Sequence, residues 1–596
     1  MGGAKAPMTA PADRGIPSRW DGIVFSAKAA MLRGRRALRE SRVHPARHPR
    51  GNALREAPIL AEIQSPLWTG GSGAGEHDLT AGKIQNLRLA ARAFDGIEIP
   101  AGAVFSFWRQ VGRATRRRGF VAGRELREGC LVASTGGGLC QLSNGLYEAA
   151  LAAGFEIVER HAHSRLVPGS RATAGRDATV FWNYVDLRFR SRAAFRIEAR
   201  LTGAELQIRF RGTATPFSGS VVPFPLPRDA AHDCVGCIRE SCGHYRPEGP
   251  TLTKRPTAWL VDACWPEYAA LMRTQAGPED RLFLPMRWPA RARYAWPALA
   301  GGETRATMAA LVRARALRRL PATGGALPRT MLEFDRRLAE AYARRLSYRH
   351  THLVVGQSLL PHLWRLGCLE GRSFDVLMDR WPLAALQARL DRALARRPES
   401  PTLGDFRAPA DIAAAETEAL AAAARLYTPH AGIAARFSDR TVLLDWVLPD
   451  VTAAPRPKIG GRTIVFPASA LGRKGAYALR DAAEGLDIDL VIGGRAREHD
   501  GPFWGGIPVR AMPAGGWPAQ VAAVVLPAIV EHQPRALLRA LALGVPVIAT
   551  ATCGIEERPG ITLVPEDDAA ALREALCRAL GDAPPQRQTA SARNSA

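Results

Sequence analysis

The stretch STGGGLCQLSNGLYEAALAAG, residues 134–154, places three glycines and one cysteine directly before a helical pattern. Leu142 and Leu146 recur on one helical face, and Gly154 is typical of the residue that ends a helix. Cys140 is therefore expected in or just before the first turn. Unpaired N–H groups and the positive end of the helix dipole stabilise an anion there, so a thiolate in this position has a lowered pKa and raised reactivity.

A nucleophilic thiol needs a base and a group that orients this base. The segment ERHAHS, residues 159–164, is predicted to be a strand with His161 and His163 on one face, and Asp177 is predicted to begin another strand. A cysteine at a helix start, then histidine and a carboxylate on strands, is the chain order of papain- and transglutaminase-like folds, which is an analogy of order. The alternatives are a metal site shared by these side chains and a buried, inert thiol.

The glycines before the cysteine suit a substrate site. Without side chains, Gly137 and Gly138 let a substrate carbonyl come close to the backbone and its N–H donors. The catalytic interpretation assigns the nucleophile, the base and the orienting group to Cys140, to His161 or His163, and to Asp177.

The segments around this helix predict an α+β domain over residues 61–215. A helical pattern precedes the glycines, and the runs at 193–201 and 205–212 alternate between apolar and polar residues. Such alternation favours an antiparallel sheet packed on helices. Residues 1–60 are rich in Arg, Pro and Gly and are predicted to be a loose, disordered basic arm.

Residues 216–254 are expected to be a Pro-rich linker with a small cysteine cluster of spacing C-x2-C-x4-C. Three thiolates and an imidazole suit zinc, whereas an iron–sulfur cluster would need a fourth thiolate, for which Cys264 is available. A redox disulfide and free thiols are the alternatives. The expected metal ligands are Cys234, Cys237, Cys242 and His244.

The C-terminal part alternates short buried strands with helical segments, which indicates parallel sheets with crossover helices. Two Rossmann-like domains are predicted, at 255–455 and 456–582, followed by a disordered tail at 583–596. The fold class is therefore multidomain, an α+β domain followed by an α/β pair. Ligands bind at strand ends in such sheets, where His362, Arg380 and His430 are expected.

The chain has 596 residues, a net charge of +25 and nine cysteines in uneven clusters. The charge favours anionic partners, among them a membrane surface, although an overall compositional bias toward Arg explains it equally well. No nucleic-acid motif accompanies it. The sequence has no apolar run long enough to span a bilayer and no secretory signal, so the expected location is the cytoplasm, with peripheral binding at the inner membrane face as an extension.

Three segments, 82–108, 136–164 and 175–191, together resemble the VanW family, and the similarity extends over about residues 65–212. The family is named from an accessory protein of vancomycin-resistance clusters and is often linked to cell-envelope modules. The resemblance implies a bacterial protein whose partner is an envelope precursor. It transfers a set of motif residues, which are Gly136 to Gly138, Cys140, Gln141, His161, His163, Ser164 and Asp177.

Segments 473–483, 488–494 and 525–554 resemble GT-B glycosyltransferases, which have two Rossmann-like domains with a cleft between them. The resemblance implies a nucleotide-sugar donor and assigns its diphosphate to Lys474 and Gly475, with Arg473 replacing a missing upstream basic residue. Glu531 matches the first of two donor-site glutamates. The second position is Arg539, which reverses the charge at the expected ribose contact.

The leading hypothesis is a two-part envelope protein that combines cysteine-dependent amide or ester chemistry with nucleotide-sugar transfer. The competing hypothesis is a non-catalytic ligand-binding or scaffold protein whose glycosyltransferase fold is degenerate, as Arg539 would permit. The sequence does not fix the substrate, the donor sugar or the oligomeric state.

Overall fold

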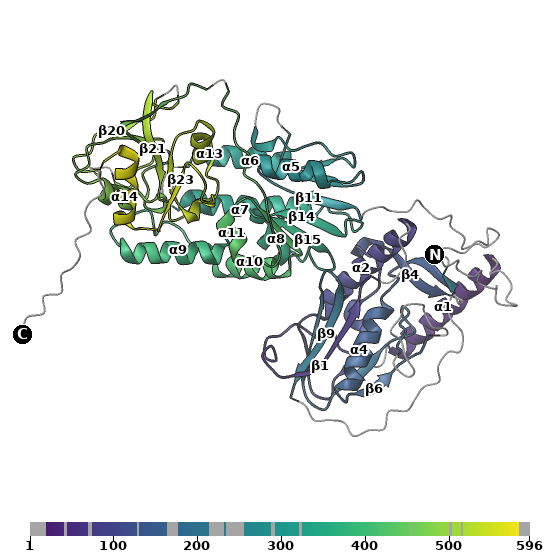
Figure 1. Ribbon diagram of the computed structural model, residues 1–596. Helices are drawn as coiled ribbons and strands as arrows, with labels where there is room; N and C mark the ends of the chain where they lie inside the picture. The colour runs from purple at the N-terminus through teal and green to yellow at the C-terminus, as the bar shows by residue number, and fades with distance from the viewer. Residues whose placement is uncertain are drawn as a thin grey trace, which may run out of the picture. The chain divides into compact units, whose positions relative to one another are not determined.

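The computed structural model describes residues 19–40, 45–68, 74–127, 130–163, 177–213, 232–233, 255–287, 292–320, 325–452, 454–499, 503–513 and 516–582. The chain forms two compact units (Figure 1). Unit 1 comprises Met1–Arg255, Ser347–Thr351 and Glu370–Arg372, and unit 2 comprises Pro256–Leu346, His352–Leu369 and Ser373–Ala596. The predicted disordered tail, 583–596, lies outside the described residues.

Unit 1 contains four helices and ten strands in its described part. The helices are α1 (Arg19–Glu40), α2 (Ala74–Phe94), α3 (Phe107–Val111) and α4 (Cys140–Ala152). The strands are β1 (Ile59–Pro66), β2 (Ile97–Ile99), β3 (Val104–Ser106), β4 (Ala122–Arg127), β5 (Cys130–Thr135), β6 (Glu156–Glu159), β7 (Arg188–Arg190), β8 (Phe195–Leu201), β9 (Glu205–Gly212) and β10 (His232–Asp233). One turn of 3-10 helix is η1 (Arg116–Arg118).

The core of unit 1 is an antiparallel sheet in the order β1-β9-β8-β2. Alternate residues of β9, namely Leu206, Ile208 and Phe210, are buried, as the period-two pattern predicted. Helix α4 packs on β1 and β9 (Figure 1), and a Cβ on Gly145 would contact the Ile208 side chain, so glycine permits this close approach. The prediction of an antiparallel sheet packed on helices is confirmed.

The strands expected at His161–His163 and from Asp177 onward are not formed. Strand β6 ends at Glu159, and residues 161–163 and 177–180 are irregular. The backbone of Ala178 donates to Asn144 Oδ1 and accepts from Ser143 Oγ, both on α4. The second segment is therefore held by helix side chains instead of by a neighbouring strand, which a period-two pattern does not reveal.

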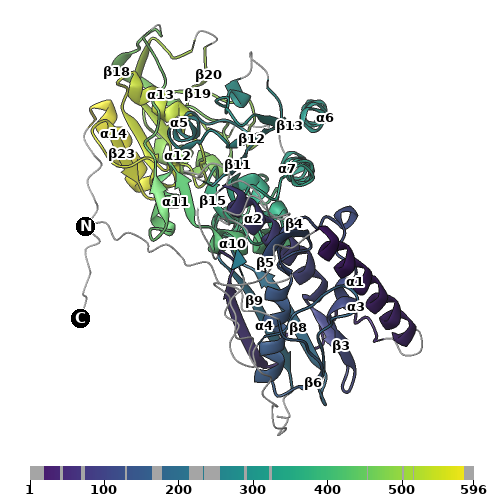
Figure 2. The same cartoon turned by 90° about the vertical axis from the view of Figure 1, so that its right-hand side faces the viewer.

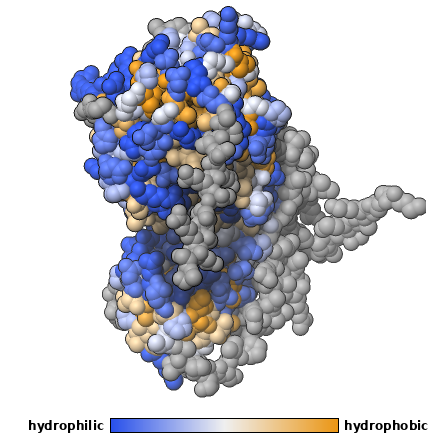
Figure 3. Space-filling model, turned by 60° about the vertical axis from the view of Figure 1, so that its left-hand side comes forward, coloured by the Kyte–Doolittle hydropathy of each residue, from blue (hydrophilic) through white to orange (hydrophobic). Residues whose placement is uncertain are grey.

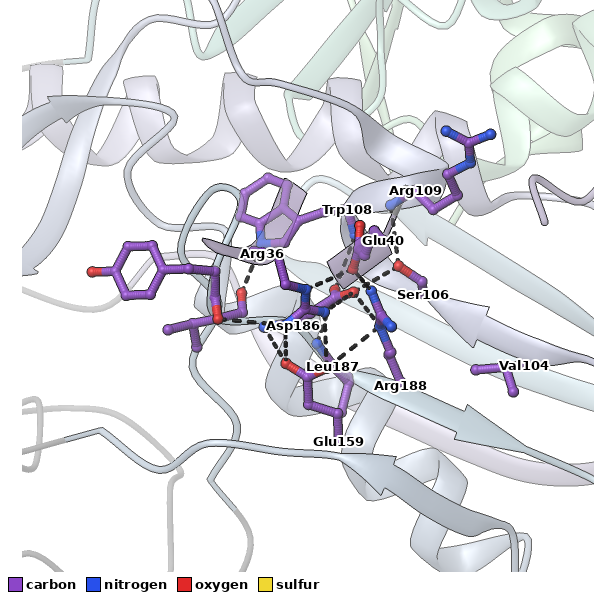
Figure 4. Close-up of polar contacts among 12 residues, drawn as sticks. Arg36, Glu40, Val104, Ser106, Trp108, Arg109, Glu159, Asp186, Leu187 and Arg188 are labelled. Atoms are coloured by element: carbon purple, nitrogen blue, oxygen red, sulfur yellow. Dashed lines mark hydrogen bonds and ion pairs between the residues drawn. The ribbon is translucent and has the colours of Figure 1, made fainter. Parts of the chain in front are cut away.

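The predicted loose arm contains a helix. Helix α1 covers Arg19–Glu40 and runs along one side of unit 1 (Figure 2), while residues 1–18 lie outside the described part. Arg36 is only 9% exposed because its guanidinium pairs with Glu40 at 2.6 Å and with Glu159 at 2.7 Å (Figure 4). The sequence predicted a loose, disordered arm over residues 1–60, so the prediction was wrong for α1.

Unit 2 contains two sheets. The first half comprises β11 (Thr257–Leu260), α5 (Pro266–Gln275), β12 (Arg281–Leu284), η2 (Ala292–Tyr294), β13 (Glu303–Arg305), α6 (Thr307–Leu317), α7 (Ala326–Ala343), β14 (His352–Gly356), η3 (Gln357–Leu359), α8 (Leu360–Arg365), β15 (Ser373–Leu377), α9 (Leu383–Arg396), α10 (Ala410–Ala422), β16 (Arg425–Thr428), α11 (Ala431–Arg436) and β17 (Thr441–Leu443). The second half comprises β18 (Lys458–Phe466), η4 (Gly472–Lys474), α12 (Ala476–Ala483), β19 (Asp489–Ile492), β20 (Val509–Ala511), β21 (Gln520–Leu526), α13 (Arg535–Ala542), β22 (Val547–Thr550), η5 (Ala551–Cys553), β23 (Ile561–Val564) and α14 (Ala569–Leu580).

Both sheets of unit 2 are parallel throughout. Their orders are β13-β12-β11-β14-β15-β16-β17 and β20-β19-β18-β21-β22-β23. In each sheet the first strand along the chain lies centrally, and the order reverses beside it, which is the Rossmann arrangement. The central strands are buried on both faces, as in β11 and β22, because helices cover both sides of the sheet. The prediction of two Rossmann-like halves is confirmed.

The surface is mixed. One face of the molecule is largely hydrophilic, interrupted by apolar patches (Figure 3), which is ordinary for a folded protein. Within the described ranges, every helix is too short or too polar to cross a bilayer.

Gly475 provides a test of the second half of unit 2. It has φ of +82° between η4 and α12, and a Cβ there would clash with the carbonyl oxygen of Pro527. Gly475→Ala is expected to lower the free energy of unfolding of unit 2 by about 3 kcal/mol, since it adds a clash to the left-handed backbone cost.

Gly485 is the matched control because its φ is +71° and a Cβ would meet nothing within 4 Å. Gly485→Ala is expected to cost about 1 kcal/mol, the backbone part alone. Urea denaturation measures both variants, and equal losses would contradict the close approach at Pro527.

Candidate functional site

Cys140 is the first residue of α4, as the sequence predicted. Its Sγ lies 3.4 Å from the hydroxyl of Thr179 and 4.0 Å from the carbonyl oxygen of Val180, and the residue is partly buried. The thiol therefore faces the irregular segment that follows Asp177. Its place at the helix start puts it at the positive end of the helix dipole, while the N–H groups of Gln141 and Leu142 already donate to the carbonyls of Gly138 and Leu139 at 3.2 and 3.0 Å.

His163 and Asp177 form a tight pair beside this thiol. His163 Nδ1 lies 2.5 Å from Asp177 Oδ1, and the His163 backbone N–H donates to Asp177 Oδ2 at 2.5 Å. The two side chains are 10% and 4% exposed. Because Asp177 occupies Nδ1, the other ring nitrogen is left for the Cys140 sulfur, whose charge raises the pKa of His163.

The charges of the three groups support one another. Burial lowers the pKa of His163, but Cys140 and Asp177 outweigh it and raise that pKa to about 10. Burial raises the pKa of the Cys140 thiol, yet the neighbouring His163 lowers it overall, and the pKa of Asp177 is lowered in the same way. All three shifts favour a thiolate–imidazolium pair beside a carboxylate over the neutral thiol and imidazole.

Two residues that sequence analysis missed hold this arrangement together. Ser143 Oγ donates to the carbonyl of Ala178 at 2.6 Å, and Asn144 Oδ1 accepts from the Ala178 N–H at 2.7 Å. They fix the segment that begins with Asp177 against the first turns of α4. The signal in the sequence was a polar Ser-Asn pair on a helix whose other face is apolar. The structure shows that Ser143 is fully buried.

His161 lies outside this cluster. Its ring is 47% exposed, and its Nε2 lies 3.3 Å from Glu159 Oε1. Glu159 also pairs with Arg36 and Arg188, and these charges lower its pKa to about 2 against the raising effect of burial. The sequence predicted both histidines on one strand face, but His161 contacts Glu159 and His163 contacts Asp177.

The glycines and Gln141 contact neighbouring chain. A Cβ on Gly137 would clash with the carbonyl oxygen of Gly123 in β4, and a Cβ on Gly123 would clash with the carbonyl oxygen of Gly137. A Cβ on Gly138 would clash with the Lys83 side chain. Gln141 Nε2 donates to Ser65 Oγ and Pro66 O, both at 2.9 Å. These contacts close the loop onto β4, α2 and β1, whereas the sequence analysis expected an opening for substrate.

Lys83 is a buried cation that sequence analysis missed. It is 9% exposed, and burial together with the charge of Arg124 lowers its pKa to about 8. Within the described residues its amine has no ion-pair partner, while Arg124 pairs with Glu76 at 2.5 Å. Lys83 packs on Gly138, two residues before Cys140.

In unit 2, Lys474 lies beyond the end of β18 and Glu531 beyond the end of β21, which is the neighbouring strand. Lys474 Nζ lies 2.8 Å from Glu531 Oε2, and Glu531 Oε1 accepts the N–H groups of His532 and Gln533 at 2.8 and 3.0 Å. Burial raises the pKa of Glu531, but Lys474 lowers it overall. The two groups form an ion pair at the carboxyl edge of the sheet, where ligands bind in open α/β folds.

A cavity of about 350 Å³ adjoins this ion pair and is lined by both halves of unit 2. Its apolar lining includes Leu327, Met331, Leu386, Leu403 and Phe406. Its charged and polar lining includes Asp335, Arg380, Arg473, Lys474 and His532.

Buried polar atoms without hydrogen-bond partners belong to two residues of the cavity lining, Asp335 and Arg380, and to two residues that interact with Arg380. They are Asp335 Oδ1, Asp379 Oδ1, Arg380 Nε and, on α8, His362 Nε2. Burial raises the pKa of Asp335 to about 7. Unsatisfied buried groups of this kind favour a polar ligand.

The remaining predicted residues of unit 2 have other contacts. The Arg473 carbonyl accepts from the N–H groups of Ile529 and Val530 at 3.0 and 3.1 Å. Arg539 is exposed on α13. His430 Nε2 faces the carbonyls of Thr552 and Glu531 at 3.0 and 3.2 Å, so its ring ties strand ends together.

The predicted metal ligands Cys234, Cys237, Cys242 and His244 lie outside the described residues, as does Ser164. In the part of the chain that is described, His, Cys, Asp and Glu form no group of three or more suited to a metal ion. Cys264 is described, and burial raises the pKa of its thiol to about 11, which keeps it protonated.

These observations define a two-module protein: an α+β domain with a cysteine–histidine–aspartate cluster, and a pair of Rossmann-like domains with a lysine–glutamate pair at their strand ends. Family comparisons agree with this division. Residues 82–211 match the family model described as VanW like protein, and residues 503–582 match the model described as Glycosyl transferases group 1. The chain therefore carries a VanW-like domain and a glycosyltransferase-like module.

Two curated relatives match the VanW-like region. One is the Uncharacterized protein YoaR of Bacillus subtilis, 39% identical over 109 residues, which cover 18% of this chain and 35% of that protein. The other is the Vancomycin B-type resistance protein VanW of Enterococcus faecalis, 36% identical over 112 residues, which cover 18% of this chain and 41% of that protein. The chain thus spans less than half of the length of either relative.

Solved glycosyltransferase structures resemble the other part of the chain weakly. Sucrose-phosphate synthase from Thermosynechococcus elongatus is 16% identical with a TM-score of 0.37, over 55% of this chain and 90% of that one. HepE from Anabaena, solved with UDP and glucose, is 11% identical with a TM-score of 0.30, over 55% and 90% of the two chains. The fold assignment rests on the two parallel sheets themselves.

The cluster predicts how Cys140 reacts with an alkylating agent. Because His163 lowers the pKa of Cys140, iodoacetamide should label Cys140 rapidly at about pH 7, below the ordinary thiol pKa of about 8.5. His163→Gln should slow this labelling about ten-fold or more at that pH and restore the ordinary pH dependence.

His161→Gln is the matched control, since His161 contacts Glu159 instead of the thiol. Labelling is followed on the Cys140 peptide by mass spectrometry. Equal labelling of wild type and His163→Gln at about pH 7 would argue against the ion pair.

Proposed function

We propose that the VanW-like domain is a cysteine-dependent acyl transferase or hydrolase that acts on an amide or ester of a cell-envelope precursor. The observation that carries this proposal is the 2.5 Å contact between Asp177 and His163, whose ring interacts electrostatically with the Cys140 sulfur at the start of α4. A nucleophile, a base and an orienting group in this order are what covalent acyl transfer requires.

In the proposed reaction the Cys140 thiolate attacks the carbonyl carbon and forms a C–S bond. The positive end of the α4 dipole stabilises the oxyanion. His163 gives its proton to the leaving amine or alcohol as the C–N or C–O bond breaks, which leaves a thioester on Cys140. Asp177 keeps Nδ1 engaged, which leaves the other ring nitrogen for the proton transfer.

The second half of the reaction returns the site to its first state. Water or an acceptor amine loses a proton to His163 and attacks the thioester carbonyl. The C–S bond breaks, the acyl group leaves with the new nucleophile, and the Cys140 thiolate faces a protonated His163 again. Water as the nucleophile makes the domain a hydrolase, and an amine acceptor makes it a transferase.

The envelope context rests on the match to the VanW model and on the relative named Vancomycin B-type resistance protein VanW. An envelope precursor carries amide bonds, which fits the proposed chemistry.

We propose that the glycosyltransferase-like module binds a nucleotide-sugar donor, with the diphosphate at Lys474. The group 1 glycosyltransferase match and the position of Lys474 at a strand end support this assignment. The donor must compete with Glu531 for the lysine, because the two already form an ion pair. Gly475 lets η4 turn into α12 beside the diphosphate position. The alternative is a module that binds a ligand without transferring sugar.

Hydrolysis of an activated ester such as p-nitrophenyl acetate tests the thiol chemistry. Cys140→Ala should lower kcat/KM by about a thousand-fold or more, and Asp177→Asn by about a hundred-fold or more, because the ring loses its orientation. Wild type should accumulate an acetyl adduct on Cys140, seen by mass spectrometry.

His161→Gln serves as the control and should change kcat/KM by less than about two-fold. An adduct on another cysteine, or full activity in Cys140→Ala, would contradict the proposed nucleophile. Unfolding measurements on each variant separate lost chemistry from lost structure.

Calorimetry with UDP and other nucleoside diphosphates tests the donor site. Lys474→Ala should weaken diphosphate binding about ten-fold or more, since a charge-assisted contact is lost. Arg578→Ala, in the last turn of α14 and paired with Glu574, is the matched charge control and should leave affinity within about two-fold. Absence of binding with every nucleoside diphosphate, or equal binding by Lys474→Ala, would count against the donor site.

A further inference from the structure

Helix α1 presents an exposed apolar face. Six of its large apolar side chains are between 37% and 75% exposed, and four of them, Trp20, Val24, Met31 and Leu38, follow one another along a single helical stripe. The other two are Ile23 and Leu32. Exposed apolar side chains scattered singly need no explanation, whereas a continuous stripe along one helix does.

The opposite face of α1 is held by polar contacts. Arg36 Nη1 and Nη2 lie 2.7 and 2.9 Å from the two carboxylate oxygens of Glu159, and Arg36 Nε lies 2.6 Å from Glu40 (Figure 4). Arg188 pairs with Glu40 and lies 2.8 Å from Asp186. Arg33 Nε donates to the carbonyl of Trp182 at 2.9 Å.

This orientation is the reverse of the usual one. A surface helix ordinarily turns its apolar face to the core and its charges to water. In α1 a charged face is docked on the domain by ion pairs and hydrogen bonds, and the apolar stripe is left outside. Desolvated ion pairs fix the helix in this orientation because separating them would leave buried charges unpaired.

The residues beside the stripe indicate what covers it. Lys28, Arg35 and Arg39 are exposed on one side of it and are basic. We propose that α1 is an interfacial helix that docks the VanW-like unit on an anionic lipid surface. The apolar stripe enters the boundary between headgroups and acyl chains, and the three cations contact lipid phosphates.

Other occupants fit the face less well. A nucleic acid would use the cations but gains nothing from burying six apolar side chains. A second copy packed on the same face would bring Lys28, Arg35 and Arg39 of both copies together, in a chain that already carries +25. A bilayer with anionic headgroups satisfies both the apolar and the basic parts of the surface.

The proposal is independent of the thiol chemistry and of sugar transfer. Under this proposal, the buried ion pairs around Glu159 hold α1 at the angle at which it meets the lipid. Helix α1 contacts the segment around Trp182, which follows Asp177 and Thr179 on the wall of the Cys140 site. Docking would therefore fix how that site is presented to the membrane.

Vesicle sedimentation of the full chain tests the proposal, with vesicles of phosphatidylcholine alone and of phosphatidylcholine mixed with phosphatidylglycerol. Wild type should bind the anionic vesicles and not the neutral ones. Two triple variants should each lower the partition coefficient about ten-fold or more. They are Trp20→Ser/Met31→Ser/Leu38→Ser for the stripe and Lys28→Gln/Arg35→Gln/Arg39→Gln for the cations.

Matched controls remove other exposed side chains of the same kind and should stay within about two-fold of wild type. They are Leu443→Ser/Ile459→Ser/Val509→Ser and Arg495→Gln/Arg497→Gln/Arg558→Gln, all exposed in unit 2. Unchanged circular dichroism establishes that the variants fold.

Three outcomes would overturn the proposal. The first is no binding to anionic vesicles, or binding that survives the stripe variant, which would reflect general charge. The second is a wild-type dimer in light scattering that the stripe variant converts to a monomer without any change in vesicle binding. The third is binding of duplex DNA that the cation variant abolishes, with no vesicle binding.

Discussion

Two buried aspartates, Asp177 and Asp186, fix the segment between them, and both the thiol site and α1 depend on it. A carboxylate removed from water must be paired or hydrogen-bonded. Asp177 meets this requirement through the ring and backbone of His163. Asp186 meets it through Ser106 Oγ at 2.6 Å, the Trp108 N–H at 3.1 Å and Arg188 at 2.8 Å. The stretch between them then supplies Thr179 to the thiol and backbone carbonyls to α1.

In unit 2, the parallel sheets, and not buried carboxylates, determine where the charged groups lie. Neighbouring parallel strands end at the same edge of a sheet. Lys474, after β18, and Glu531, after β21, therefore meet although 57 positions separate them in the sequence. A lysine there attracts an anion, and Glu531 supplies one within the chain itself. The neighbouring cavity joins an apolar wall to charged groups, which is the composition of a site for an amphipathic ligand.

Local sequence patterns predicted the helices and strands whose formation depends on the local sequence. Helical spacing and a closing glycine put the start of α4 at Cys140, and strict alternation found β9. The pairing of side chains could not be found in this way. The local sequence does not distinguish His161 from His163. Their different contacts depend on Asp177, 14 residues after His163, and on Glu159, which pairs with Arg36 from 123 residues earlier in the chain. Long-range pairing also explains why a basic arm was predicted where α1 forms.

The approach between Gly123 and Gly137 has an evolutionary consequence. A Cβ on either glycine would clash with the carbonyl oxygen of the other. A larger residue at one position therefore cannot be accommodated by a smaller residue at the other, which already has no side chain. Only displacement of β4 from the loop before Cys140 would make room. The two positions therefore constrain each other across the contact between β4 and the loop that carries the thiol. Divergent sequences that retain this loop geometry are expected to carry glycine at both places, whatever substrate they have come to use.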